Sequence, residues 1–275
     1  MEVIQKYSGA GNKFIILNNL NISYSDRRNK VLELMSEEGN DKMDGVIFLE
    51  RSSIGDFHMN YFNRDGSGNA LCANGLRCTA RYIRDNKLSD SNDLIIEAVS
   101  KKYECKILDD KRIAVAFPPP LRIKTRFKLK VNFVEWWQLL TASYVDVGSP
   151  HIVVFIDDIE KPVVESLSDV KIMEWGQNIR MHKDLMPEGA NVNFVYVVSK
   201  EKGEIEIRSY ERGVERETLA CGTGAISSAI IAVALRGLKT PINVLTKSGS
   251  YLTVDFDIAD NEVQNLSLAG GAERI

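Results

Sequence analysis

The sequence predicts a mixed α+β protein made of two pseudo-symmetric domains, each a largely antiparallel β-sheet rolled around one central α-helix. The first observation is that residues 218–235 contain no charged side chain, and a helix without a polar stripe is buried on all sides. The second is that Cys72 and Cys221 lie in matching segments, offset by 149 positions. The third is that strand-like segments dominate elsewhere, with few recognisable helix-crossover units between them.

The two halves share a series of local signals. Each of the two cysteines is followed three residues later by a glycine and then by a helix-like run, and a polar loop precedes each, at 63–67 and at 211–213. Earlier in each half, Gly-Asn at 11–12 and Gly-Ser-Pro-His at 148–151 lead into an apolar strand. Repeated signals in the same order indicate internal duplication, and we expect a site in the cleft between the halves.

Composition is that of an ordinary globular protein. The 275 residues are 44% hydrophobic and 27% charged, with a net charge of −3, a balance that gives no reason to expect a nucleic-acid partner. The first residues lack the basic start and apolar core of a signal peptide. The apolar run at 218–235 is shorter than the roughly 20 residues of a membrane span. We therefore expect a cytoplasmic protein with no membrane partner.

Four cysteines in a cytoplasmic chain do not indicate a disulfide framework. Their positions, 72, 78, 105 and 221, contain no Cys-x-x-Cys pair, so we predict no metal site. Cys78 falls in a helix and Cys105 in a strand-like run. We interpret both as small core residues.

In the first half, apolar runs predict a series of strands and two helices. Val31 and its apolar neighbours have helical spacing within residues 26–38. The central helix of this half is predicted from about residue 75 to residue 85, with Arg77, Arg81 and Arg84 on an exposed face. The predicted strands are residues 3–7, 14–17, 46–49, 57–62, 94–97, 102–108 and 112–117.

The proline run at 118–120 cannot continue a hydrogen-bonded ladder, so the domain boundary is placed there. The first domain, residues 1–117, then carries Cys72, and the second, residues 118–275, carries Cys221. We expect about the last ten residues of the second domain to pack back on the first.

Basic residues alternate from 122 to 130. This pattern fits either a polyanion-binding stripe or a solvated strand face opposite Ile123, Phe127 and Leu129, and the acidic net charge favours the strand face. The other strands predicted in this half are residues 144–147, 152–156, 191–197, 204–210, 242–245 and 252–256.

The central helix of the second half begins near the second of the two matching cysteines. Thr218 and Thr223 are candidate caps, and Gly237 is the candidate stop. Unsatisfied backbone N–H groups and the positive end of the helix dipole favour a thiolate at such a helix start. Gly222 and Gly224 let the backbone come close to an anion, as binding of a substrate carboxylate requires.

Seen together, these motifs resemble those of the diaminopimelate epimerase family, cofactor-independent enzymes of lysine and peptidoglycan precursor synthesis. The chain has Ala73 where that family's pattern has a glycine, and Ser149 where it has an asparagine. The resemblance covers essentially the whole chain, through the blocks Gly9-Ala10-Gly11-Asn12, Asn63-Arg64-Asp65-Gly66-Ser67, Cys72-Ala73-Asn74-Gly75-Leu76-Arg77-Cys78, Gly148-Ser149-Pro150-His151, Asn191-Val192-Asn193-Phe194, Glu211-Arg212-Gly213 and Ala220-Cys221-Gly222-Thr223-Gly224.

The resemblance implies roles for particular residues. Cys72 and Cys221 would act as base and acid on opposite faces of the substrate α-carbon, with His151 and Glu211 as polar partners of the cysteines and of the ammonium group. It implies a small amino-acid substrate and no metal or other cofactor, and it leaves a homodimer open. The substrate-binding residues it implies are Asn12, Asn63, Ala73, Asn74, Ser149, Asn191, Glu211, Arg212, Gly222 and Thr223.

This chemistry suits cysteine. Epimerisation removes an α-proton from one face and returns a proton to the other, and two fixed groups do this without moving. A thiol pKa of about 8.5 lets one thiolate and one thiol coexist near neutral pH. The function expected is interconversion of L,L- and meso-diaminopimelate.

Two alternatives stay open. One is another cofactor-independent racemase, acting on proline, hydroxyproline or histidine, although the Glu-Arg-Gly block at 211–213 differs from the Asp-Arg-Ser-Pro type of lead in proline racemases. The other is a non-catalytic binding protein of the same fold, against which the intact pair Cys72 and Cys221 argues.

Overall fold

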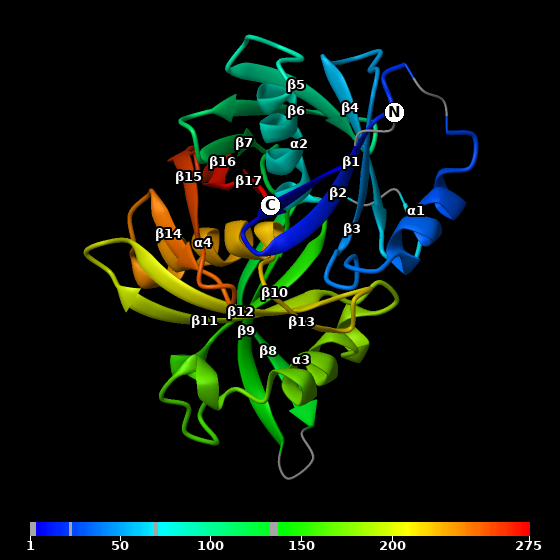
Figure 1. The fold of residues 1–275 in the computed structure, drawn as a ribbon. Coiled ribbons are helices and arrows are strands. Elements are labelled where there is room, and N and C mark those ends of the chain that lie inside the picture. Colours follow the sequence, from blue (N-terminus) through cyan, green and yellow to red (C-terminus); the bar gives the residue numbers. More distant parts are fainter. Residues whose placement is uncertain (1–3, 22–23, 69–70, 133–136) are drawn as a thin grey trace. The chain divides into compact units, whose positions relative to one another are not determined.

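The structure is a computed structural model that describes residues 4–21, 24–68, 71–132 and 137–275. The chain divides into two compact units (Figure 1). The N-terminal unit comprises Met1–Phe117 and Ala269–Ile275, and the C-terminal unit comprises Pro118–Leu268. Strands form most of each unit.

The N-terminal unit contains a mixed sheet. Pairs β1–β2, β3–β4, β5–β6 and β6–β7 are antiparallel, whereas β2–β3 and β4–β5 are parallel. A helix follows the first strand of each parallel pair, because parallel neighbours need a crossover connection. The elements are β1 (Ile4–Gly9), β2 (Asn12–Asn18), α1 (Arg27–Ser36), β3 (Gly45–Glu50), β4 (Phe57–Asn63), α2 (Ala73–Asp85), β5 (Asp93–Ala98), β6 (Lys101–Ile107), β7 (Arg112–Ala116) and β17 (Glu273–Arg274).

Both ends of the described chain lie in this unit. Strand β17 pairs with β1, with Arg274 opposite Tyr7, and the Ala272 N–H donates to the Lys111 carbonyl at 3.0 Å. The predicted first strand began at Val3, which lies outside the described residues.

The C-terminal unit repeats the pairing pattern. Pairs β8–β9, β9–β10, β11–β12, β12–β13 and β14–β15 are antiparallel, and β10–β11 and β12–β14 are parallel. The elements are β8 (Arg122–Asn132), β9 (Trp137–Asp146), β10 (Pro150–Phe155), η1 (Ile156–Asp158), η2 (Leu167–Asp169), α3 (Ile172–Arg180), η3 (Lys183–Leu185), β11 (Asn191–Ser199), β12 (Glu204–Glu211), β13 (Arg216–Thr218), α4 (Gly222–Arg236), β14 (Ile242–Leu245), β15 (Tyr251–Ala259) and β16 (Glu262–Gly271).

Crossover units are therefore more frequent than the sequence analysis expected. Each unit has two, carried by α1 and α2 in the first and by α3 and α4 in the second. Helix α3 was not predicted. It buries only Ile172, Trp175, Gly176 and Ile179, and Trp175 packs against Phe194 of β11 with ring centroids 6.2 Å apart.

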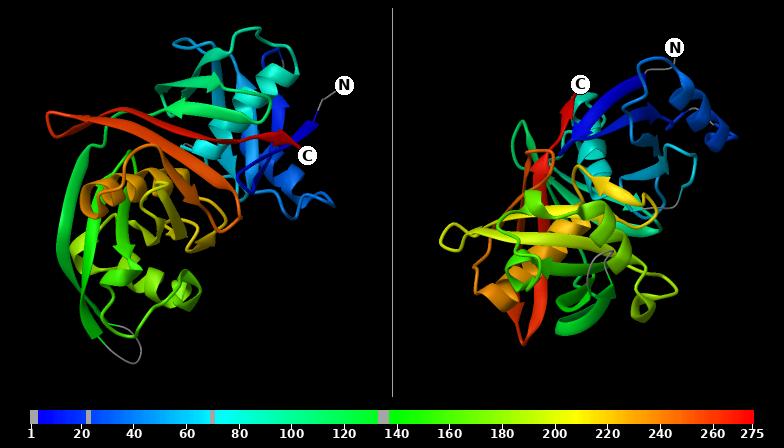
Figure 2. Two further views of the ribbon diagram at one scale, coloured as in Figure 1. Left: turned by 90° about the vertical axis from the view of Figure 1, so that its left-hand side faces the viewer. Right: turned by 90° about the horizontal axis from the view of Figure 1, so that it is seen from below.

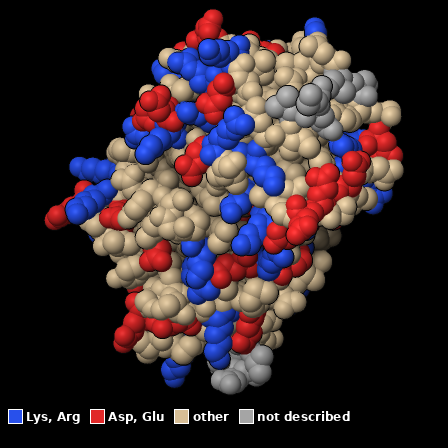
Figure 3. Space-filling view, in the orientation of Figure 1, with Lys and Arg blue, Asp and Glu red and all other residues tan. Residues whose placement is uncertain are grey.

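Strands β8 and β9 form a long antiparallel pair (Figure 2), and the end of β9 also pairs with β10. The basic side chains of β8 are exposed, which confirms the prediction of a solvated strand face. The opposite face is buried at Leu129 and half-buried at Phe127, whereas Ile123 is 42% exposed, contrary to expectation. On the face in Figure 3, basic and acidic side chains are interspersed.

Helix α2 is enclosed by strands of the N-terminal unit, including β1, β2, β6 and β7. The prediction of an exposed arginine face is wrong for Arg77, which is 0% exposed, and only Arg84 is fully on the surface. The sheet wraps so far around this short helix that even a charged position falls inside.

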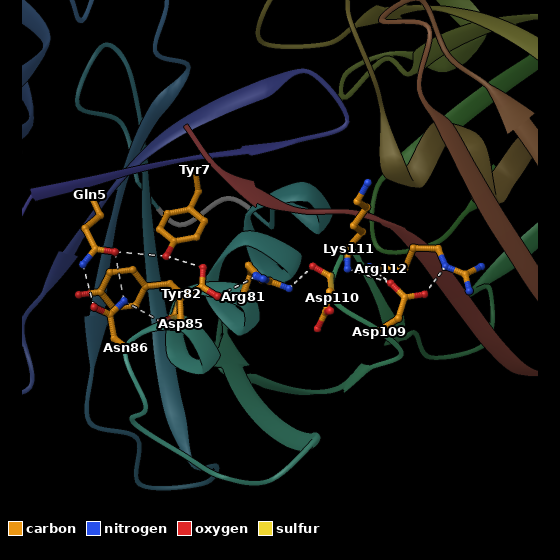
Figure 4. Close-up of polar contacts among 10 residues, drawn as sticks. All are labelled: Gln5, Tyr7, Arg81, Tyr82, Asp85, Asn86, Asp109, Asp110, Lys111 and Arg112. Atoms are coloured by element: carbon orange, nitrogen blue, oxygen red, sulfur yellow. Dashed lines mark hydrogen bonds and ion pairs between the residues drawn. The ribbon is translucent and has the colours of Figure 1, made fainter.

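The C-terminal end of α2 is fastened by polar contacts (Figure 4). The Tyr7 hydroxyl of β1 donates to Asp85 Oδ2 at 2.9 Å, and Asp85 Oδ1 lies 2.9 Å from Arg81 Nε. Arg81 Nη1 in turn donates to the Asp110 carbonyl in the β6–β7 turn. These contacts fix the helix at its far end and leave its N-terminus for the candidate site.

Helix α4 is the buried helix predicted from the uncharged run. Ala225, Ile226, Ala229 and Ile231 are all 0% exposed. Gly237 ends the helix with φ 70°, as predicted, in the left-handed conformation that glycine adopts without strain.

Candidate active site

The two matching cysteines occupy the same position in the two units. Cys72 is the N-cap of α2, and its Sγ accepts the Gly75 N–H at 3.3 Å. Cys221 is the N-cap of α4, and its Sγ accepts the Gly224 N–H, also at 3.3 Å. The cysteines thus cap the helices themselves, in place of the predicted Thr218 and Thr223. A helix N-terminus favours a negative charge on such a sulfur.

Glycine at the third helical position brings the helix close to its neighbours. A Cβ on Gly224 would lie 3.1 Å from Cys221 Sγ and would collide with Asn193 Oδ1. In the N-terminal unit, a Cβ on Gly75, the third residue of α2, would lie 3.3 Å from Cys72 Cβ and 3.3 Å from Met59 Sδ. The Cys221 turn therefore has no room for a larger residue at Gly224, and the Cys72 turn is tightly packed at Gly75.

In the N-terminal unit, two of the predicted binding residues, Asn12 and Asn74, are hydrogen-bonded to each other at the N-terminus of α2. The Asn74 side-chain amide donates to Asn12 Oδ1. Asn12 Nδ2 donates to Asp44 Oδ2 at 3.2 Å, and the Lys13 N–H donates to the same oxygen at 2.8 Å. Asn12 and Asn74, which are 62 positions apart in the chain, are thus oriented by one hydrogen-bond chain.

The remaining predicted residues of this unit lie close to the same loops. Ala73 is buried as the first residue of α2. Asn63 ends β4 and belongs to a different hydrogen-bond set, since its Oδ1 accepts from the Tyr61 hydroxyl at 2.9 Å and its Nδ2 donates to Ser67 Oγ at 3.0 Å.

His151 is the centre of a polar cluster in the C-terminal unit. Its side chain is 0% exposed, and burial, followed by the nearby positive charge of Arg212, lowers its pKa to about 3. The imidazole is therefore neutral at physiological pH. Its Nε2 lies 2.9 Å from Thr223 Oγ1 and 3.0 Å from Ser149 Oγ.

Asn193 fixes the tautomer of this histidine. Its Nδ2 donates to the Ile152 carbonyl at 3.1 Å, and a carbonyl can only accept, so the amide has one orientation. The same nitrogen donates to His151 Nδ1 at 3.1 Å, and this contact is shorter than the 3.4 Å between Asn191 Nδ2 and Nε2, so we assign the proton to Nε2. Nε2 then donates to Thr223 Oγ1, whose hydroxyl lies 3.6 Å from Cys221 Sγ. Asn193 was quoted within a motif but not predicted as a site residue, because its partners come from distant strands.

The Glu211–Arg212 loop joins this cluster. Asn191 Oδ1 accepts the Arg212 N–H at 2.9 Å, and Asn191 Nδ2 donates to the Pro150 carbonyl at 3.1 Å. The Arg212 side chain donates to the Glu188 carbonyl at 3.2 Å. Glu211 accepts a hydrogen bond from Thr218.

Cys221 is held as a thiol in this surrounding. Burial, and then the Glu211 carboxylate, raise the pKa of Cys221 well above its usual value, while hydrogen bonds from Thr223 and the Gly224 N–H lower it. Gly222, the first residue of α4, is buried beside it. The predicted residues of the C-terminal unit therefore gather at the N-terminus of α4.

All four cysteines lie in described segments and are thiols rather than disulfides. Among the described residues, no group of three or more His, Cys, Asp or Glu side chains could hold a metal ion. No helix in the described part of the chain has the length and apolar character that a membrane span needs.

A family model for diaminopimelate epimerase matches residues 4–120 and 143–273. The chain belongs to the diaminopimelate epimerase family. A diaminopimelate epimerase of Hydrogenobaculum sp. is 34% identical, over 93% of this chain and 91% of that protein. One of Aquifex aeolicus is 32% identical, over 98% and 94%. The resemblance given by the ordered motifs is thus confirmed.

Solved structures confirm the predicted fold class. A Bacillus anthracis protein of the PhzF phenazine-biosynthesis family matches with a TM-score of 0.74 at 15% identity, over 99% of this chain and 96% of that one. A probable proline racemase from Agrobacterium radiobacter matches with a TM-score of 0.68 at 13% identity, over 100% and 91%. At these identities the likeness concerns the fold, whereas the family assignment rests on the epimerases.

Proposed function

We propose that the protein interconverts L,L- and meso-diaminopimelate by transferring an α-proton between Cys72 and Cys221. Membership of the diaminopimelate epimerase family makes the chain an isomerase with diaminopimelate as substrate. The observation that carries the assignment of the two bases is their matched geometry: each sulfur caps a buried helix and accepts the N–H of a glycine three residues on, at 3.3 Å in both cases.

In the proposed reaction, one cysteine is a thiolate and the other a thiol. The thiolate takes the α-proton, and the electron pair of the broken C–H bond passes into the α-carboxylate, which gains enolate character. The second thiol then gives its proton to the opposite face, so the configuration inverts and the protonation states of the two sulfurs are exchanged. The proposal requires that the two sulfurs reach the same α-carbon of the substrate from opposite faces.

Helix starts supply the stabilisation that this step needs. First-turn N–H groups, such as those of Gly222 and Thr223, point outward from the helix and carry partial positive charge. Donors already in place stabilise developing negative charge without reorganising during the reaction. No electron sink beyond these donors is invoked, and we propose that the reaction needs no cofactor.

Around Cys221, we assign His151 as a positioning residue rather than as a base. Its neutral ring donates from Nε2 to Thr223, and the Thr223 hydroxyl is thereby oriented toward Cys221. Glu211 favours the protonated form of Cys221 and provides a carboxylate for the substrate ammonium group.

The proposed substrate-binding set combines amide, guanidinium and backbone donors. Diaminopimelate carries two carboxylates and two ammonium groups, and these need donors and acceptors in fixed positions. Asn12 and Asn74 are held by their own hydrogen-bond chain. The full set is Asn12, Asn63, Ala73, Asn74, Ser149, Asn191, Glu211, Arg212, Gly222 and Thr223.

A cytoplasmic location and a homodimer belong to the same proposal. Four cysteines kept as thiols suit a reducing compartment. Sedimentation of the purified protein measures the oligomeric state directly.

The deciding experiment is proton exchange. The protein is incubated with L,L-diaminopimelate in D2O, and the α-proton signal is followed by NMR while the meso isomer is quantified by chiral chromatography. We expect deuterium at the α-carbon together with meso product, and little action on proline. Faster turnover of proline or histidine would assign the protein to the sister racemases, and binding without exchange would make it a binding protein.

A further inference from the structure

Arg77 is a buried charge in the first turns of α2. Its side chain is 0% exposed. A helical side chain leans toward the N-terminus of its helix, and here Nη2 donates to Asn74 Oδ1 at 2.6 Å while Nη1 lies 3.5 Å from the Ala73 carbonyl. The guanidinium is thus folded back to the residues that directly follow Cys72.

No carboxylate in the described part of the chain pairs with this guanidinium, and its buried Nε has no hydrogen-bond partner there. Burial lowers the pKa of Arg77, yet arginine stays protonated near neutral pH. A buried, charged group without a counter-ion carries a large desolvation cost. Such costly groups concentrate at functional sites.

The negative charge that this cation can stabilise belongs to a thiol. The groups that act electrostatically on Arg77 are Cys78, Cys72 and Cys105. Burial raises the pKa of Cys105 to about 12 and that of Cys78 even further, so both stay protonated. Cys72 is only half-buried and is the one of these three thiols that is partly exposed to solvent.

Other titratable side chains around α2 do not compete for this role. On the strands packed against the helix, burial raises the pKa of Tyr7 and Tyr103, which keeps both neutral, and the Tyr61 hydroxyl donates to Asn63. Asp44, before β3, is connected to Arg77 only through the side chains of Asn12 and Asn74.

The matched position in the C-terminal unit carries no charge. When the two halves of the sequence are aligned with the 149-residue offset between Cys72 and Cys221, Ile226 corresponds to Arg77. Ile226 is 0% exposed and apolar. The charged neighbour of Cys221 is instead the Glu211 carboxylate, which favours the thiol. At the matched position, five residues after the cysteine, α2 therefore carries a cation and α4 an apolar side chain.

We propose that Arg77 is a positioning residue for Cys72. Its guanidinium orients the side chain of Asn74, which in turn orients Asn12. The same guanidinium supplies a buried positive charge that stabilises Cys72 as the thiolate of the free protein, while Cys221 is the thiol. The proposal rests on the function proposed above. When Cys72 ionises, its proton passes to solvent, and Arg77 keeps its own proton throughout.

The unsubstituted protein gives the first test. Alkylation by iodoacetamide, which is neutral and reacts with the thiolate, is measured as an initial rate between pH 5 and pH 10, and each cysteine is quantified by peptide mass spectrometry. We expect the midpoint of the pH–rate profile for Cys72 to lie at least about one pH unit below that for Cys221. An equal midpoint, or a lower one for Cys221, overturns the proposal.

The second test removes the charge. In Arg77→Met, the volume is nearly kept and the charge is lost, so alkylation of Cys72 at pH 7 should slow by about tenfold or more, as its midpoint rises by a pH unit. The midpoint of Cys221 should not move. Arg84→Met, on the exposed side of the same helix, is the matched control and should leave both midpoints in place.

A folded Arg77→Met protein with an unchanged Cys72 midpoint would leave Arg77 a purely structural residue and overturn the proposal. If Arg77→Met does not fold, the comparison of the two thiols in the unsubstituted protein decides alone. Neither alkylation test uses the substrate. Absent proton exchange would therefore contradict the proposed function, whereas unchanged alkylation midpoints would contradict the role of Arg77, and the two results can be told apart.

Discussion

The side-chain amide of Asn193 donates to Nδ1 of His151 at 3.1 Å, and both residues are 0% exposed. This contact determines which nitrogen of the imidazole carries the proton, because the amide orientation is itself fixed by the Ile152 carbonyl. The order of donors then runs from Asn193 through His151 to Thr223 at the start of α4. Through the histidine, Asn193 thus controls a hydroxyl that lies beside Cys221.

Replacing the amide by a carboxylate should reverse this order. In Asn193→Asp, the new carboxylate accepts from Nδ1–H, so the neutral ring should change to the Nδ1–H tautomer, and Thr223 should lose its donor. We expect a fall in kcat of about tenfold to a hundredfold, corresponding to a buried hydrogen bond of about 1–3 kcal/mol. Nitrogen-15 chemical shifts of the imidazole report the tautomer, and an unchanged Nε2–H form would contradict this order of donors.

Both matching cysteines should be indispensable. Cys72→Ala and Cys221→Ala should each lower epimerisation by roughly a hundredfold to ten-thousandfold, since a proton removed from one face cannot be supplied from the other. Serine should be almost as damaging, because a hydroxyl is a much weaker acid than a thiol. The assay is the appearance of the meso isomer, with circular dichroism to verify folding.

The two other cysteines provide the matched controls. Cys78→Ala and Cys105→Ala alter buried cysteines that do not cap a helix, so they should keep most of the turnover and change the free energy of unfolding by about 1 kcal/mol. A folded Cys72→Ala or Cys221→Ala protein that still epimerises at the parent rate would end the two-thiol mechanism.

The buried histidine makes stability depend on pH with a definite sign. The pKa of His151 is about 3 in the folded protein, against an ordinary value of 6.5. Between these values the unfolded chain binds a proton that the folded protein does not. The free energy of unfolding should therefore fall as pH decreases from 6.5 toward 3, by up to about 1.4 kcal/mol per pH unit from this residue.

Urea denaturation at several pH values measures this slope. The matched variant is His151→Asn, which removes the titrating group, so the difference in slope between parent and variant isolates the histidine from the carboxylates. Equal slopes in the two proteins would mean that His151 binds its proton in the folded state as well.

Arg208 and Glu217 form a bidentate ion pair near the Cys221 loop. Nε and Nη2 of Arg208 donate to the two carboxylate oxygens at 2.6 and 2.9 Å, and Nη1 donates to the Leu167 and Val170 carbonyls. The side chains are only 13% and 19% exposed. Arg208→Met should destabilise the protein by about 3 kcal/mol, because it leaves a partly buried carboxylate and two carbonyls without their donor.

The control for this variant is Arg112→Met. Its pair with Asp109 is exposed on both sides, at 63% and 43%, so its loss should destabilise the protein much less than the loss of the Arg208 pair. Chemical denaturation of the two variants gives both values. A loss for Arg208→Met no larger than that for Arg112→Met would show that the bidentate pair adds little.

Local sequence determined the burial of helix α4 and the residue at which it ends. The uncharged run at 218–235 had to be a buried helix because it offers no polar face to water, and Gly237 had to end it because glycine readily adopts the left-handed conformation. The cysteine turns were recognisable from the spacing of Cys72 and Cys221 to their glycines, and the ordered motifs indicated the family. The assignment of site residues and of two duplicated domains stays a prediction.

Tertiary structure decided what the periodicity of a single segment could not. Arg77, Arg81 and Arg84 have the spacing of one helix face, and nothing in α2 itself tells how far the sheet wraps around it, so a buried cation was predicted to be exposed. The role of Asn193 depends on His151 and Ile152, 42 and 41 positions away. Helix caps and apolar stripes arise from contacts within a few residues and can be inferred from the sequence, whereas burial of a charge and the tautomer of a histidine arise from strands that only folding brings together.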